Sequence, residues 1–109
     1  MAVKMFPGDQ FTSDRRVAWT RSRAQAAFRG ERWSLTWNDF CTFWNSELRW
    51  QQRGKAKDCL VLSRFDYEKG WTKSNCCIIT RYQHLCASRA WRAGGDMSPH
   101  YKGAILYGQ

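Results

Sequence analysis

Two short apolar segments constrain the fold of this chain more than any other feature of its sequence. Cys59 to Phe65 has the length and apolar content of a short strand, and Cys76 to Ile79 predicts a second one. Asp66 to Gly70 lies between them as a turn, in which Gly70 can adopt a positive φ. Neither segment approaches the roughly 20 apolar residues of a membrane-spanning helix. The sequence therefore predicts a β-hairpin and no membrane partner.

A helix is predicted before this hairpin, from Asp14 to Arg29, with Thr12 or Ser13 as its cap and Gly30 as its stop. Its apolar residues share one face, which we expect to be buried and which carries Val17, Ala24 and Phe28. Its other side is basic and carries Arg15, Arg16, Arg21, Arg23 and Arg29. Such a run is usually a solvated face, but the lack of interleaved acids past Asp14 also makes it a candidate phosphate-binding stripe.

A second helix is predicted where Thr36 and Asp39 form a capping box, with Asp39 at the position where Glu or Gln is usual. This helix runs to about Gln51. Its aromatic stripe has helical spacing and is interpreted as core, with the residues Phe40, Phe43, Trp44 and Leu48.

A third helix is predicted after the hairpin, capped by Thr80, running from Arg81 to about Ala93 and ended by Gly94 and Gly95. The side chains expected on its packed face are Tyr82, Leu85 and Cys86.

The order of these segments predicts a small single-domain α+β fold over residues 1–109, with two helices followed by a short β-hairpin and a helix. Residues 1–12 are expected to form an irregular lead-in, with a turn at Pro7 and Gly8. Residues 96–109 form a tail, and the side chains expected to dock it on the body are Tyr101, Ile105 and Leu106.

The charge of the chain indicates its partners rather than its fold. Eighteen Lys and Arg against nine Asp and Glu give a formal net charge of +9. Such a surface attracts polyanions, above all nucleic acid, because neutralised phosphates release their condensed counterions. We expect nucleic acid as the partner, DNA rather than RNA. A basic chain can also be basic only for solubility, or bind an acidic protein.

The five cysteines are an odd number, and the N-terminus has no long apolar core or cleavage-like site. We therefore expect reduced thiols that are mostly buried, and a cytoplasmic location. A zinc site is not favoured, because Cys76 and Cys77 are adjacent and because His84 and Cys86 do not share a helix face.

The segment from Leu62 to Arg81 carries the most informative pattern: leucine, a polar residue, arginine, an apolar residue, aspartate, a glycine-containing turn, and Asn75 at the start of the second strand. This pattern resembles the small HNH-like proteins of phages and bacteria, and the resemblance extends over about residues 15–90. In that family the strand pair and the following helix form a ββα-metal unit, which places one divalent ion against a scissile phosphate. The resemblance implies an HNH-like ββα unit and a phage accessory protein.

The resemblance also implies roles for individual residues. Asp66, Asn75 and His84 match catalytic positions, with Asn75 bracing the loop and with Asp66 and His84 as metal ligands. The position of the general base is held by Arg64, whose guanidinium stays protonated and cannot accept a proton. Arg64 can instead clamp a phosphate, or pair with Asp66 on the same strand face and pin the turn, and we favour the pairing. No cofactor is expected, except Mg²⁺ if nuclease activity remains.

Three functions follow as hypotheses. The first is a phage protein on a degenerate HNH-like fold that binds the phosphate backbone through Arg15, Arg16, Arg23, Arg53, Lys55, Lys57, Arg64 and Lys73. The second is an inhibitor or adaptor that binds a host protein, such as RNA polymerase or a defence protein. The third is a weak metal-dependent HNH endonuclease.

Four tryptophans outside the aromatic stripe have basic neighbours, and these are Trp33, Trp50, Trp71 and Trp91. Tryptophan beside arginine can stack on unpaired bases. In so short a chain the rings can equally complete the core, and we expect most of the seven tryptophans to do so.

Overall fold

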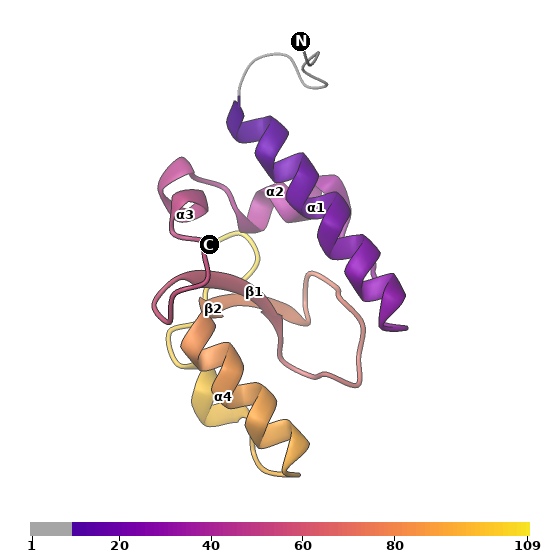
Figure 1. Ribbon diagram of the computed structural model, residues 1–109, viewed down its shortest axis with the longest axis vertical. Helices are drawn as coiled ribbons and strands as arrows, with labels where there is room; N and C mark the ends of the chain where they lie inside the picture. Colours follow the sequence, from indigo (N-terminus) through magenta and orange to yellow (C-terminus); the bar gives the residue numbers. More distant parts are fainter. Residues whose placement is uncertain (1–9) are drawn as a thin grey trace.

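The computed structural model describes residues 10–109 and has an α+β fold (Figure 1). Its elements in chain order are α1 (Gln10–Phe28), α2 (Trp37–Phe43), α3 (Glu47–Gln51), β1 (Leu60–Arg64), β2 (Cys76–Thr80), α4 (Arg81–Arg92) and the 3-10 helix η1 (Ser98–Tyr101). The expected layout of helices, hairpin and helix is confirmed. The predicted turn at Pro7 and Gly8 lies outside the described residues. No helix within residues 10–109 has the length and apolar character needed to cross a bilayer.

The hairpin forms the centre of the fold, with α1 and α4 at opposite ends of the long axis in Figure 1. β1 and β2 are antiparallel, and Leu60 pairs with Thr80 while Arg64 pairs with Cys76. Cys76 to Ile79 are all buried. Cys76 and Ile78 belong to the main core, whose other members are Trp19, Leu35, Phe40, Phe43 and Trp44. The strand is buried on both faces because α4 also packs against the hairpin.

Helix α1 buries a different face from the one predicted. Val17 and Ala24 are exposed and Phe28 is 93% exposed, whereas Trp19 and Ala26 are buried. Trp19 Nε1 donates to the Leu35 carbonyl at 3.0 Å. This contact with the segment after the helix orients α1, and the periodicity of the helix alone gives no sign of it. The helix also begins at Gln10, so that neither Thr12 nor Ser13 is its cap. Gly30 follows its end with φ of 74°, as expected for a helix stop.

The second predicted helix is two helices. The capping box of α2 is confirmed, because Thr36 Oγ1 accepts from the Asp39 N–H and Asp39 Oδ2 accepts from the Thr36 N–H, both at 3.0 Å. Helix α2 ends at Phe43, and Ser46 caps α3 by accepting from the Arg49 N–H. The predicted stripe is buried at Phe40, Phe43 and Trp44, but Leu48 is exposed because it lies on the separate helix α3.

Helix α4 has the predicted Thr80 cap, which forms a capping box with Gln83. Of its predicted packed face, Cys86 is half-buried but Tyr82 and Leu85 are exposed, and Ala87 is the buried residue of this helix. Ala87 is fully buried, so a larger side chain at that position would not fit without a shift of its surroundings.

The tail docks on the body. Ile105 pairs with Ile78 through two backbone hydrogen bonds of 2.9 Å, and the Tyr101 hydroxyl donates to the Arg64 carbonyl. Leu106, predicted to dock, is exposed. Tyr107 packs against Phe43 instead, with ring centroids 5.3 Å apart. Successive side chains of an extended segment point to opposite sides, so Leu106 faces away from the body when Ile105 and Tyr107 face it.

Candidate functional site

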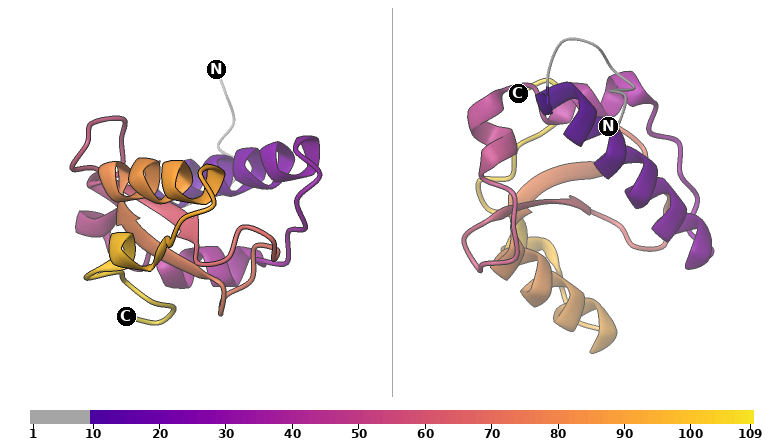
Figure 2. Two further views of the ribbon diagram at one scale, coloured as in Figure 1. Left: turned by 90° about the horizontal axis from the view of Figure 1, so that it is seen from below. Right: turned by 45° about the horizontal axis from the view of Figure 1, so that its top comes forward.

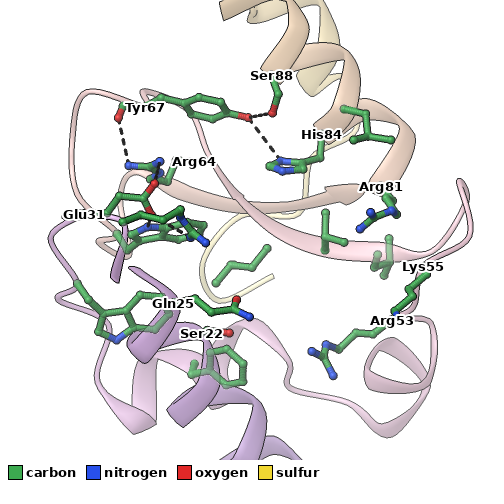
Figure 3. Close-up of a pocket in the computed structure, with 18 of the residues that line it drawn as sticks. Ser22, Gln25, Glu31, Arg53, Lys55, Arg64, Tyr67, Arg81, His84 and Ser88 are labelled. Carbon is green, nitrogen blue, oxygen red and sulfur yellow. Dashed lines mark hydrogen bonds and ion pairs between the residues drawn. The ribbon is translucent and has the colours of Figure 1, made fainter. Parts of the chain in front are cut away.

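A groove of about 1020 Å³ lies between α1 and α4, with residues of β1 in its floor. Both helices lie on the same side of the hairpin in the left view of Figure 2. Figure 3 shows Ser22 and Gln25 of α1 across the groove from His84 and Ser88 of α4. The loop after α3 closes one end, and the turn after β1 closes the other. Segments that are far apart in the sequence therefore meet around one concave surface.

The lining of the groove is strongly cationic. Among the described residues, its basic side chains are Arg29, Arg53, Lys55, Arg64, Arg81 and Arg92, and its one carboxylate is Glu31. Glu31 is already shared, because Oε1 accepts from Arg29 at 3.0 Å and Oε2 accepts from Arg64 at 3.1 Å. A cleft lined by one sign of charge raises the local concentration of oppositely charged ligands. The groove therefore favours anions.

Arg64 holds the backbone of the turn at one end of the groove through hydrogen bonds. Its side chain is nearly buried, and Nη1 donates to the Tyr67 carbonyl at 3.1 Å and to the Lys69 carbonyl at 2.9 Å. The guanidinium also lies over the ring of Trp71. The predicted pairing with Asp66 was wrong. Strand β1 ends at Arg64, so Asp66 no longer shares its face, and Asp66 Oδ1 accepts from the Glu68 N–H.

Asn75, the residue that precedes β2, braces the same turn. Its Oδ1 accepts from the Asp66 N–H, while Nδ2 donates to the carbonyls of Asp66 and Gly70 at 3.0 and 2.9 Å. Gly70 is required for close approach rather than for a positive φ, which it does not adopt. A Cβ at Gly70 would lie 2.9 Å from both the Cβ and the carbonyl oxygen of Arg32. The turn is therefore held against the segment that follows α1.

His84 lines the groove from α4 and is held by hydroxyl groups. Its Nδ1 lies 2.9 Å from Ser63 Oγ and 3.5 Å from Tyr67 Oη, and Tyr67 Oη is in turn 3.0 Å from Ser88 Oγ. Burial lowers the pKa of His84, and the positive charges of Arg81, Arg64 and Arg29 lower it further. The imidazole is therefore neutral at neutral pH.

The predicted metal ligands Asp66 and His84 each have other partners in the structure. Asp66 Oδ1 accepts from the Glu68 N–H at 2.9 Å, and His84 Nδ1 lies 2.9 Å from Ser63 Oγ. Within residues 10–109 there is no group of three or more His, Cys, Asp and Glu side chains that could hold a metal ion.

The predicted phosphate contacts divide into two sets. Arg53, Lys55 and Arg64 line the groove, whereas the side chains of five others do not: Arg15, Arg16, Arg23, Lys57 and Lys73. Arg15 donates to the Trp44 carbonyl. The other four lie over aromatic rings, with Arg16 and Arg23 over Trp19, Lys57 over Tyr82 and Lys73 over Tyr107. These cations cover the aromatic side chains of the fold.

Sequence reasoning named His84 and Trp91 but missed that one face of α4 forms a wall of the groove. Arg81, His84, Ser88 and Arg92 recur at spacings of three or four residues, which places them on one helix face. That spacing was present in the sequence as a polar and basic stripe. The opposing residues Ser22 and Gln25 carried no comparable signal.

Comparison of the chain with protein-family models, curated proteins and solved structures found no match.

Proposed function

We propose that this protein binds nucleic acid through phosphate contacts along the groove between α1 and α4. One observation carries the proposal. In the part of the chain that the structure describes, the groove has six cationic side chains and a single carboxylate, Glu31, which pairs with two of them. Within the described residues, no carboxylate forms an ion pair with the other four, which are Arg53, Lys55, Arg81 and Arg92. A polyanion that binds them releases its own counterions, and this gives affinity without base-specific contacts.

The ββα resemblance supports the same proposal. The order β1, β2, α4 and the bracing of the turn by Asn75 agree with what similarity to the HNH-like proteins implies. Arg64 stands where the HNH-like proteins have their general base. It donates to the carbonyls of the turn and cannot accept a proton. We therefore propose a degenerate HNH-like protein, encoded by a phage and acting in the host cytoplasm, that keeps nucleic-acid binding and has lost cleavage.

The test is fluorescence anisotropy of labelled DNA across a salt series, first with Mg²⁺ and then with a chelator, with the products analysed on a gel. We expect affinity that falls steeply with salt, survives chelation and leaves the DNA intact. Arg92→Gln should weaken binding and reduce the salt slope by about 1, because it removes one phosphate contact. Arg89→Gln is the matched control, since Arg89 is exposed on the same helix but does not line the groove.

Two outcomes would overturn the proposal in different ways. Absence of binding at low salt would exclude nucleic acid and leave a host protein as the target of an inhibitor or adaptor. Mg²⁺-dependent cleavage that is lost in Asp66→Ala would show a working endonuclease.

A further inference from the structure

The groove is lined by aromatic rings as well as by cations. Its rings belong to Trp33, Phe40, Trp44, Tyr67, Trp71 and Trp91. Phe40 and Trp44 are buried in the core, and Trp33, Tyr67 and Trp71 are half-buried. Trp91 differs from all of them, because it is 44% exposed. An exposed tryptophan inside a cationic groove is a surface that a planar ligand can cover.

Trp91 is held in place on its inner side. It lies on the last turn of α4, and its ring centroid is 5.6 Å from that of Tyr67. Tyr67 is itself fixed, since Oη is hydrogen-bonded to Ser88 Oγ and the Arg64 guanidinium lies 5.2 Å from the centre of its ring. The indole therefore rests on a rigid partner while part of its surface stays accessible. A platform of this kind loses little conformational entropy when a ligand stacks on it.

Cations flank this platform along the helix. Arg92 is the next residue, and Arg81 lies on the same face of α4, about 16 Å away along the helix axis. Figure 3 shows Arg53 and Lys55 near Arg81, at the end of the groove away from Tyr67. The basic groups thus extend from Trp91 along the whole groove. This is the arrangement of proteins that follow a single strand with cations and stack its bases on aromatic rings.

We propose that the groove binds single-stranded rather than duplex nucleic acid, with an unpaired base stacked on Trp91, a phosphate beside it on Arg92, and a phosphate farther along the same strand on Arg81. The inference rests on the proposed nucleic-acid binding and specifies its substrate. Base faces are accessible only in a single strand, because in a duplex they are covered by the adjacent base pairs. Trp91 therefore adds affinity for one form of nucleic acid and not for the other.

The test compares a labelled twelve-nucleotide oligothymidylate, the corresponding oligouridylate and a twelve-base-pair duplex by fluorescence anisotropy. Trp91→Ala should weaken binding of the single strands by about 5- to 150-fold, the range that corresponds to about 1–3 kcal/mol per stacked base. Binding of the duplex should change little. Tyr82→Ala is the matched control, because Tyr82 is an exposed aromatic residue of the same helix that does not line the groove. The two single strands distinguish DNA from RNA as the preferred form.

The outcomes separate this inference from the proposed function. Salt-sensitive binding in which the duplex is preferred, or in which Trp91→Ala behaves like Tyr82→Ala, would overturn the inference and leave nucleic-acid binding intact. Failure of the wild-type chain to bind any of the three probes would overturn both. Trp91→Phe keeps an aromatic face and should retain most of the single-strand affinity, and it guards against a folding defect in Trp91→Ala. Far-UV circular dichroism checks that every variant is folded.

Discussion

At the scale of single residues, the ion pair between Glu31 and Arg64 joins two parts of the chain that are 33 residues apart. Glu31 also accepts from Trp71 Nε1 and from Arg29, both at 3.0 Å. Burial alone would raise the pKa of Glu31, but these two hydrogen bonds and the charges of Arg64 and Arg29 outweigh it and lower the pKa. One carboxylate thus holds the turn end of the groove and partly neutralises its cations.

Glu31→Gln should lower the free energy of unfolding by about 3 kcal/mol, because it leaves the nearly buried Arg64 guanidinium without its counter-charge. The effect should depend on pH. A depressed pKa stabilises the fold above the ordinary value of 4.5, and this contribution is lost as the pH falls through the lower pKa of the folded state. The difference between wild type and variant should therefore shrink in acid. Urea unfolding at several pH values measures it.

Glu68→Gln is the control, because Glu68 is an exposed carboxylate in the same turn. Its effect should stay within about 0.5 kcal/mol. Equal effects of the two substitutions would mean that the pairing of Glu31 with Arg64 contributes nothing to stability.

At the scale of secondary-structure elements, capping boxes predicted where α2 and α4 begin, whereas apolar periodicity did not predict which faces of α1 and α4 are buried. Thr36 and Thr80 cap their helices as the sequence indicates, because a capping box joins residues only three positions apart. The buried faces of α1 and α4 were predicted wrongly from their apolar residues. Each helix has polar residues in the wall of the groove and uses a small buried alanine for close packing, Ala26 in α1 and Ala87 in α4.

The two buried thiols of β2, Cys76 and Cys77, should be unreactive in the folded protein. Burial raises the pKa of Cys76 and of Cys77 to about 12, and for Cys76 the neighbouring Cys77 adds to the shift. Because the thiolate is the reactive form, neither residue should be alkylated in the folded protein at mildly alkaline pH. Cys41, Cys59 and Cys86 are only partly buried and should react first. Mass spectrometry after alkylation with and without denaturant separates the two groups, and native labelling of Cys77 at the rate of Cys59 would contradict the burial of β2.

At the scale of the whole molecule, the C-terminal segment completes the core. Ile105 pairs with the backbone of Ile78, and the Tyr107 hydroxyl donates to Asp39 Oδ1 at 3.1 Å. Arg49 donates to the Gln109 carbonyl at 2.8 Å, which joins the end of the chain to α3. The tail thus connects the hairpin to the helices that precede it.

Removal of residues 104–109 should lower the free energy of unfolding by about 3 kcal/mol, because it removes the two partly buried side chains of Ile105 and Tyr107 together, and loss of one fully buried large side chain costs about 2–5 kcal/mol. Leu106→Ala should change it little, because Leu106 is exposed. The midpoint of urea unfolding measures both. A truncated chain that is as stable as the full one would show that the tail is peripheral to the core.

The sequence alone predicted the hairpin, the Thr36 and Thr80 caps, the aromatic core of α2 and the bracing by Asn75, but not the start of α1. Each depends on residues that are close along the chain, so that local geometry decides it. The partner of Arg64, the buried face of α1 and the groove between α1 and α4 were decided only by the tertiary structure. They depend on contacts between distant segments, such as Trp19 with Leu35 and Glu31 with Arg64. No local pattern specifies which segments fold together, because that choice depends on how all the elements fill one shared core.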